Sequence, residues 1–191
     1  MMCSILYNWP MEQLGRQLQK LREERQLSLR SLGELAGVSA SAISQMEAGK
    51  VSPSIATLEK ICNALGVHIA SLFDEPQGDQ GPILLRTNER RRVYSADSHA
   101  SIEPLARNFA GKKMQPILIS LEPGGVCGEH PYTSAEGEEF AMLIAGTAEF
   151  EQQDKRYQLS QGDAVYYDPR QLHNWRNLGQ DMAVLLIVVA Q

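Results

Sequence analysis

The apolar residues of this chain change their spacing partway along, and this change most limits how the chain can fold. From residue 11 to residue 73 they recur every three or four positions, the period of an α-helix. Beyond residue 116 they alternate with polar residues, the period of a β-strand. Residues 75–82, rich in proline, glycine and polar residues, have the composition of a linker. The chain of 191 residues is therefore expected to form an all-α domain over 11–74 and an all-β domain over 83–191.

The helical part divides into five short helices with explicit start and stop signals. Where three of them should begin stands a serine, whose hydroxyl oxygen can accept a hydrogen bond from a free backbone N–H. These serines are Ser28, Ser39 and Ser54. Where three helices should end stands a glycine, which adopts the left-handed backbone conformation readily. These glycines are Gly37, Gly49 and Gly66.

The second part contains six short runs with the period of strands, separated by turn signals. The runs are 116–122, 139–145, 147–151, 156–159, 164–167 and 182–189. Many short strands at this spacing favour a β-barrel or jelly roll over a parallel sheet with crossover helices.

Two of the expected helices form a helix-turn-helix. Residues 28–36 and 39–48 are joined by Gly37-Val38, the tight turn of this arrangement, whose second helix enters the major groove of DNA. From about residue 14 to residue 74 the sequence resembles the five-helix, lambda-repressor-like domain of the Xre (xenobiotic-response-element) type. The resemblance implies a DNA-binding domain.

The residues expected to contact DNA lie on the second helix of the pair and around it. Ile43 and Met46 have the spacing of core residues, so the positions beside them face outward. Gln45 is well suited to recognise a base, since its amide can bond an adenine through two hydrogen bonds. The full set comprises Arg30, Ser39, Ala40, Ser41, Ser44, Gln45 and Lys50.

Further roles are expected around this surface. The resemblance implies that Arg22 and Glu47 pair and tie two helices together. Lys50, with Ser52 and the start of the helix that follows Pro53, suits contact with phosphate. The three arginines at 90–92 are expected on a solvated face or at the edge of a dimer.

The second part also carries two motifs that resemble those of the cupin family, over roughly 116–189. The first motif contains His130 and Glu139, and the second contains His173. Tyr132 occupies the position of the family's second metal-binding histidine, and an alternative alignment also lacks one histidine. The resemblance implies a jelly-roll barrel with a damaged metal site.

A cupin fold would bring a set of polar side chains together inside the barrel, where they would form an effector pocket. The set is His130, Tyr132, Glu139, Tyr167 and His173. Glu139 favours a ligand with an amine, and Arg107 would favour a carboxylate if it faces inward. Cys127 is expected to be a spectator rather than a redox sensor.

Two histidines and one carboxylate can also form the facial triad of non-haem iron. His130, Glu139 and His173 are therefore candidate ligands of a divalent metal such as iron, zinc, nickel or manganese. Because one ligand position is lost, the favoured expectation is that no cofactor is bound.

These features favour a transcription regulator that binds DNA and responds to a small-molecule effector, and that is not an enzyme. The alternative is a cupin metalloenzyme, because a mononuclear-iron epoxidase resembles the same helical and cupin layout. That family places its glutamate four residues after its first histidine, and this spacing is absent here. A third class is a DNA-binding protein whose cupin serves only for dimerisation.

Composition sets the expected partners and compartment. With 18 basic and 23 acidic residues the net charge is −5, so binding to an operator should be modest and salt-dependent, aided by a homodimer on a palindromic site. No apolar run reaches the roughly 18 residues that a membrane helix needs. Three cysteines without a C-x-x-C spacing favour a reducing cytoplasm. The first ten residues lack the features of a secretion signal, and a translation start at Met11 is an open alternative.

Overall fold

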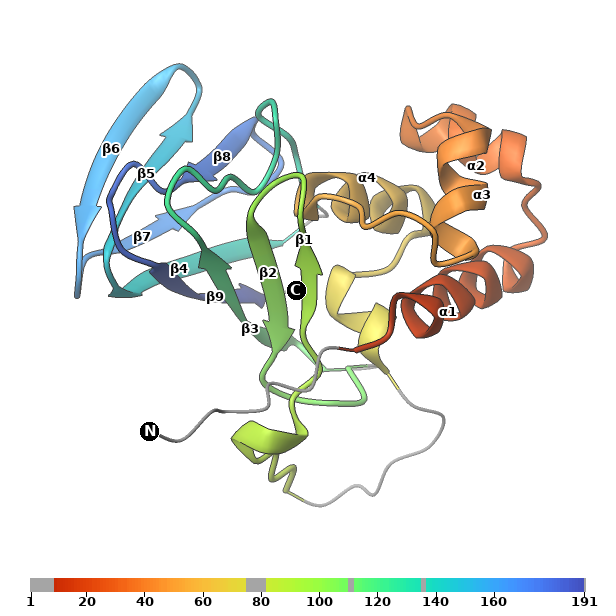
Figure 1. The fold of residues 1–191 in the computed structure, drawn as a ribbon, viewed down its shortest axis with the longest axis horizontal. Coiled ribbons are helices and arrows are strands. Elements are labelled where there is room, and N and C mark those ends of the chain that lie inside the picture. Colours follow the sequence, from red (N-terminus) through yellow and green to blue (C-terminus); the bar gives the residue numbers. More distant parts are fainter. Residues whose placement is uncertain (1–8, 75–81, 110–111, 135–136, 191) are drawn as a thin grey trace.

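The computed structural model describes residues 9–74, 82–109, 112–134 and 137–190. A helical domain lies beside a β-barrel domain, as the ribbon in Figure 1 shows. The predicted fold class, a helix-turn-helix domain followed by an all-β cupin-like domain, is therefore confirmed. Most of the predicted linker, 75–82, falls outside the described residues.

The helical domain contains four α-helices, and the predicted fifth helix is a 3-10 helix. They are α1 (Met11–Glu24), α2 (Leu29–Ala36), α3 (Ala40–Glu47), α4 (Ile55–Leu65) and η1 (Ile69–Phe73). The three predicted serine caps are present, since Ser28, Ser39 and Ser54 accept hydrogen bonds from the backbone N–H three residues later. These caps satisfy donors that each helix start otherwise leaves unpaired.

Helices α1 and α3 cross closely and are joined by an ion pair. Arg22 donates from Nε and Nη2 to the two carboxylate oxygens of Glu47, at 2.7 and 2.8 Å, as predicted. Gly15 of α1 lies at the crossing, where a Cβ atom would come within 2.6 Å of the Met46 carbonyl oxygen. Helix α3 is therefore held against α1 by a charged pair and by a position that only glycine can occupy.

The second domain is built from antiparallel strands in two sheets. The strands are β1 (Val93–Ser95), β2 (Ala100–Pro104), β3 (Met114–Leu121), β4 (Glu138–Ala145), β5 (Thr147–Gln152), β6 (Lys155–Ser160), β7 (Ala164–Tyr167), β8 (His173–Arg176) and β9 (Ala183–Ala190). One sheet has the order β1-β2-β3-β9-β4-β7 and the other β6-β5-β8. All six predicted runs are strands, and the sequence pattern missed β1, β2 and β8.

Alternation along the strands defines an inside and an outside of the barrel. In β4, Glu139, Ala141 and Leu143 are buried, whereas the residues between them are exposed. Aromatic side chains fill the interior, where the Phe150 ring packs at a tilt against those of Tyr167 and Trp175, with ring centres 4.7 and 4.6 Å apart. The interior is therefore largely apolar, with a few polar groups among the rings.

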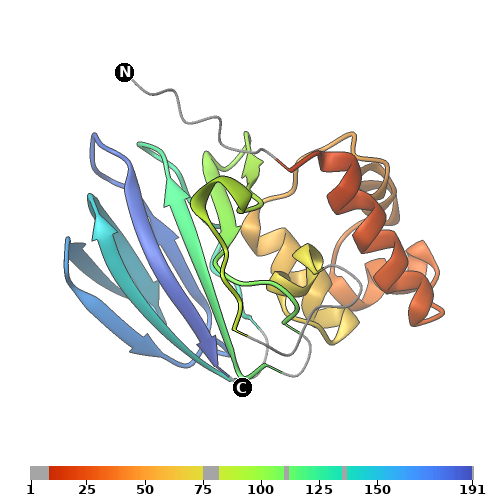
Figure 2. The same cartoon turned by 90° about the horizontal axis from the view of Figure 1, so that it is seen from below.

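Helix α4 joins the two domains, because it packs against one end of the barrel (Figure 2). The backbone N–H of Ala56 donates to the Cys127 carbonyl at 3.0 Å, and the Asn63 amide donates to the Thr133 carbonyl at 3.1 Å. Gly128 lies against Ala56, where an added Cβ would come within 2.6 Å of the alanine methyl. The helical domain is thus docked on the barrel.

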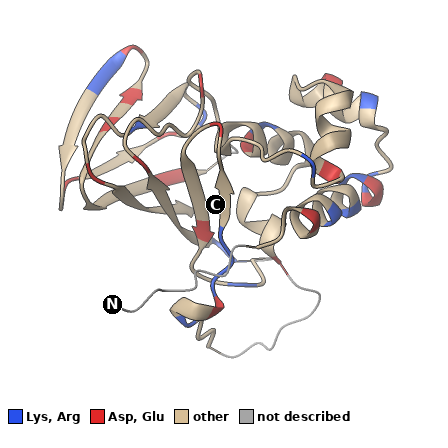
Figure 3. Cartoon of the chain, in the orientation of Figure 1, with Lys and Arg blue, Asp and Glu red and all other residues tan. Residues whose placement is uncertain are grey.

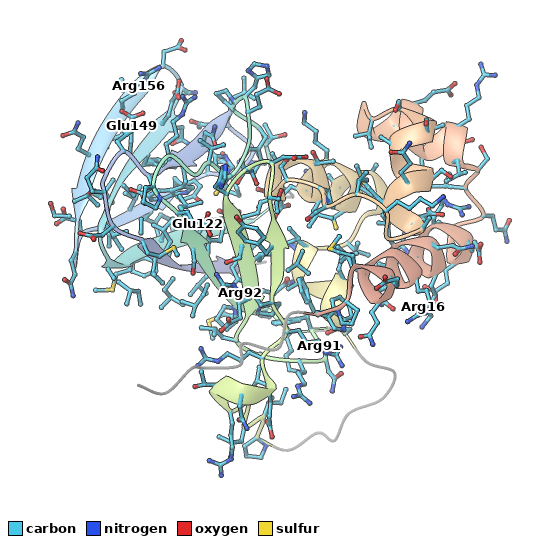
Figure 4. The ribbon with its side chains drawn as sticks, viewed as in Figure 1. Arg16, Arg91, Arg92, Glu122, Glu149 and Arg156 are labelled. Carbon is cyan, nitrogen blue, oxygen red and sulfur yellow. The ribbon has the colours of Figure 1, made fainter. Side chains whose placement is uncertain are left out.

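A second junction lies around the chain just before α1. Trp9 stacks on Phe73 with ring centres 5.2 Å apart, and the Arg91 guanidinium lies 5.1 Å from the Trp9 ring centre. Arg92 donates to the Ser101 hydroxyl, and Arg90 pairs with Glu103 at 3.1 Å. The expectation of a solvated arginine face was wrong, because all three arginines are half-buried and bonded within the chain; Figure 4 labels two of them at this junction.

None of the helices in the described ranges is both long and apolar enough to cross a membrane.

Candidate functional site

Helix α3 presents a row of polar side chains to solvent. Ile43 and Met46 are buried in the helical core, while Ser41, Ser44 and Gln45 are exposed, as the period of the helix predicts. The exposed side chains carry hydroxyl and amide groups, which can donate to and accept from the edges of bases.

The other predicted DNA contacts surround this row. Arg30 on α2 and Lys50 after α3 are exposed, and Ala40 is half-buried at the start of α3. Ser39 is the N-cap of α3, so its hydroxyl oxygen already accepts from the Ala42 N–H at 3.1 Å. Arg30 pairs with Glu34 at 3.0 Å, but both side chains are largely exposed and such a surface pair contributes little. Figure 3 shows both signs of charge along the helical domain.

The part of the predicted phosphate contact that rested on Ser52 and the start of α4 was wrong, whereas Lys50 is exposed and keeps its predicted role as an expectation. The Ser52 hydroxyl donates to the Tyr94 carbonyl of the barrel at 2.6 Å, so its proton is already used. Two of the first N–H groups of α4 are also occupied, since Ala56 donates to Cys127 and Thr57 donates to the Ser54 side chain. This helix start faces the barrel.

Inside the barrel, four of the five predicted pocket residues lie together. Tyr167 donates to the Glu139 carboxylate at 2.5 Å, and the Trp175 indole N–H donates to the Tyr167 hydroxyl oxygen at 3.2 Å. The His173 ring lies between those of Tyr132 and Tyr167, with ring centres 4.8 and 5.1 Å away. We call Tyr132, Glu139, Tyr167 and His173 the barrel cluster.

The protonation of the barrel cluster follows from its burial. Burial raises the pKa of Glu139 to about 7, although hydrogen bonds from Tyr167 and Ser134 oppose this shift. Burial also lowers the pKa of His173, so its ring is neutral near pH 7. His173 Nδ1 lies 3.0 Å from the Gln171 carbonyl oxygen and is therefore the protonated nitrogen, which leaves Nε2 as an acceptor.

Two other predicted residues lie apart from the barrel cluster. His130 is exposed in the turn between Gly128 and Pro131. Arg107 faces away from the interior, since it donates to the Glu89 carbonyl at 3.2 Å, so it offers no carboxylate-binding group there.

The described residues do not fit a metal centre. No three His, Cys, Asp or Glu side chains among them gather in a way that could hold a metal ion, so His130, Glu139 and His173 do not form a triad. Glu139 is bonded instead to Tyr167, and His130 is exposed.

Two further buried groups lie beside the barrel cluster, and the first of them, Glu59, was not singled out by the sequence analysis. Glu59 of α4 is only 7% exposed, and burial followed by the charge of Glu139 raises its pKa to about 8. Cys127 is fully buried, and burial raises the pKa of its thiol to about 12, which agrees with the spectator role expected for it. A signal for Glu59 existed, because α4 is apolar on two faces and this carboxylate falls on one of them.

Comparison with known proteins agrees with this arrangement. Residues 13–72 match the helix-turn-helix domain family, and residues 117–189 match the cupin domain family. The HTH-type transcriptional regulator PuuR of Escherichia coli (strain K12) is 26% identical over 163 residues, which cover 85% of this chain and 86% of that protein. The HTH-type transcriptional repressor RghR of Bacillus subtilis (strain 168) is 47% identical over 64 residues, covering 33% of this chain and 47% of that protein.

A solved structure has the same two-domain arrangement. The crystal structure of an HTH_3 family transcriptional regulator from Vibrio cholerae superposes with a TM-score of 0.73 and 25% sequence identity, covering 95% of this chain and 97% of that one. The similarity therefore extends over both domains.

Proposed function

Since the chain belongs to the helix-turn-helix transcription regulators that join an Xre-type DNA-binding domain to a C-terminal cupin domain, we propose that it binds an operator through α3 and that a small molecule bound at the barrel cluster changes this binding. The observation that carries the proposal is the exposed row of Ser41, Ser44 and Gln45 on a helix fixed from behind by Ile43 and Met46. Lys50 and Arg30 flank this row and provide phosphate contacts.

The barrel cluster supports the second half of the proposal. A buried glutamate and a buried neutral histidine sit among aromatic rings, the usual composition of a small-molecule site. Perturbed pKa values of buried groups gather at functional sites more often than elsewhere. The effector is taken up inside the barrel, and the operator is bound at the other end of the helical domain.

A homodimer follows from the outer face of the larger sheet. Leu118, Leu186, Met142 and Ala164 lie in one row across β3, β9, β4 and β7. Phe140 and Met142 are 37% and 36% exposed in this chain. Pairing of this face with the same face of a second copy removes it from water and creates two-fold symmetry, which matches a palindromic operator.

Fluorescence anisotropy with the DNA upstream of the protein's own gene tests the proposal. We expect saturable binding that exceeds binding to a scrambled duplex and that weakens as salt is raised, because phosphate contacts release counterions. Equal, weak binding to both duplexes would contradict it and leave the helical domain as a scaffold. The metalloenzyme alternative is not favoured, since the candidate ligands do not gather.

A further inference from the structure

One face of α4 is directed at the end of the barrel. Ala56 and Asn63 both hydrogen-bond to the barrel segment 127–133, at 3.0 and 3.1 Å. Glu59 lies three residues after Ala56 and four before Asn63, so all three side chains share one face of the helix. Glu59 is therefore carried by the DNA-binding domain but faces the barrel cluster.

Glu59 lacks any partner among the residues that the structure describes. It is more than nine-tenths buried, yet neither a hydrogen bond nor an ion pair joins it to another described group. Its charge acts on Glu139, which carries the same charge, and on the buried side chains of Cys62, Cys127 and Tyr132. A buried carboxylate without a partner is costly, and such groups in native proteins call for an explanation.

The same helix face holds a second acceptor without a donor. The Asn63 amide nitrogen donates to Thr133, which leaves Oδ1 pointing the other way, and this oxygen is buried without a hydrogen-bond donor. Asn63 therefore needs a group that donates, and Glu59 needs one whenever its carboxylate is ionised. No lysine or arginine is among the groups whose charges act on Glu59 or Glu139.

We propose that the effector is a small organic cation with N–H donors, such as a primary amine, and that it binds between Glu59 of α4 and Glu139 of the barrel. This inference rests on the proposed function and extends it, because it makes the effector site an interdomain site. Tyr132 and Tyr167 beside Glu139 add aromatic faces, which attract a cation. A metal ion fits less well, since no three ligands gather among the described side chains.

A site shared by two domains has a regulatory consequence. A cation held by both carboxylates binds tightly only while α4 sits on the barrel, so its affinity depends on how the domains are docked. By linkage, occupancy shifts the position of α4, which packs on the same helical domain as α3. Glu59 is the residue through which the barrel and the DNA-binding domain share the ligand.

Isothermal titration calorimetry on the full-length protein tests this inference. The probes are short linear primary monoamines and diamines of increasing chain length, with short-chain carboxylates as the anionic comparison. The variants are Glu59→Gln and Glu139→Gln, each of which keeps the shape of the side chain and removes its charge. Glu149→Gln is the matched control, since Glu149 is also a buried glutamate of the chain but lies on the side of the barrel far from the helices (Figure 4).

The expected result is that an amine binds the wild type and the Glu149→Gln variant alike, and that each of the other two variants loses about tenfold or more in affinity. Loss in Glu139→Gln with full binding in Glu59→Gln would overturn the interdomain site but leave an effector pocket in the barrel. Binding of none of the amines to the wild type would overturn the ligand class. Neither result would contradict operator binding, which the anisotropy experiment measures separately.

Discussion

Gln45 is the side chain of α3 with the best chemistry for recognising a base. Its amide is exposed and can form two hydrogen bonds with adenine. We expect Gln45→Ala to reduce the preference for the operator over a scrambled duplex by about 1–3 kcal/mol, with a smaller effect on nonspecific binding. Anisotropy titrations with both duplexes measure this difference.

The matched control for Gln45→Ala is Gln158→Ala, the same change at an exposed glutamine of β6. The control should bind both duplexes as the wild type does. An unchanged preference in Gln45→Ala would show that α3 does not read the sequence through this residue.

Glu59 should make the protein less stable as the pH rises. Its pKa is raised in the folded state, to about 8 from 4.5, by burial and by the charge of Glu139. The stabilising protonated form is therefore fully present below about pH 4.5 and is lost as the pH rises through about 8. We expect Glu59→Gln to raise the free energy of unfolding at pH 8 by about 2–4 kcal/mol and to change it little at pH 5.

Urea denaturation at a series of pH values measures this effect. The difference between Glu59→Gln and the wild type should grow steadily with pH. Parallel stability curves would contradict the assignment of a buried, unpartnered carboxylate. A buried residue whose neutral replacement stabilises the fold is a residue kept for function.

Among the elements, the crossing of α1 and α3 leaves no room for a side chain at Gly15. A methyl group there would press on the Met46 carbonyl oxygen of α3. We expect Gly15→Ala to destabilise the protein by about 1–3 kcal/mol and to weaken operator binding, because α3 must shift. Thermal unfolding followed by circular dichroism measures the stability.

Gln13→Ala on the same helix is the control for this change, since Gln13 is exposed. It should unfold at the wild-type temperature. A Gly15→Ala variant as stable as Gln13→Ala would mean that α1 and α3 are less closely packed than described.

The elements also show what a sequence can predict. Serine caps and glycine turns act within four residues, so the starts of α2, α3 and α4 were predicted correctly. Strand β8 was missed because its four residues include a buried asparagine, whose amide is satisfied by the backbone of Gly128. Such a strand does not alternate between apolar and polar residues.

The sequence predicted the four residues of the barrel cluster correctly but added a fifth residue that lies elsewhere. The spacing of the cupin motifs brought Tyr132, Glu139, Tyr167 and His173 together, since these residues lie on or beside strands. His130 was placed in the pocket but lies outside, because the preceding Gly128 is fixed between α4 and β8 and the turn after it runs over the surface. Helical periodicity places Glu59 on an apolar face of α4, but it could not place this face opposite the barrel, since no periodic pattern relates a helix to the other domain.

At the scale of the whole molecule, we expect a homodimer that forms through the apolar outer face of the larger sheet. Met142 of β4 lies on this face between Leu186 of β9 and Ala164 of β7. We expect Met142→Glu to weaken the dimer by about 2 kcal/mol or more, roughly thirtyfold, because a charge would be buried at the interface. Sedimentation velocity over a range of concentrations measures the dissociation.

Leu178→Glu is the control for the dimer, since Leu178 is 62% exposed in the loop after β8, outside the larger sheet. It should sediment as the wild type does. A Met142→Glu variant that remains fully dimeric would assign the interface to another surface.

The contacts of Trp9 lead to a different expectation about how the molecule is assembled. Its ring and its backbone N–H link Phe73 at the end of the helical domain with Arg91 and Arg92 of the barrel domain. Together with α4, these contacts fasten the domains without help from the peptide bonds of 75–81. Two separately synthesised fragments, cut within that stretch, should therefore find each other and rebuild one protein. The peptide bonds between the two domains would then serve only to keep the domains at a high local concentration.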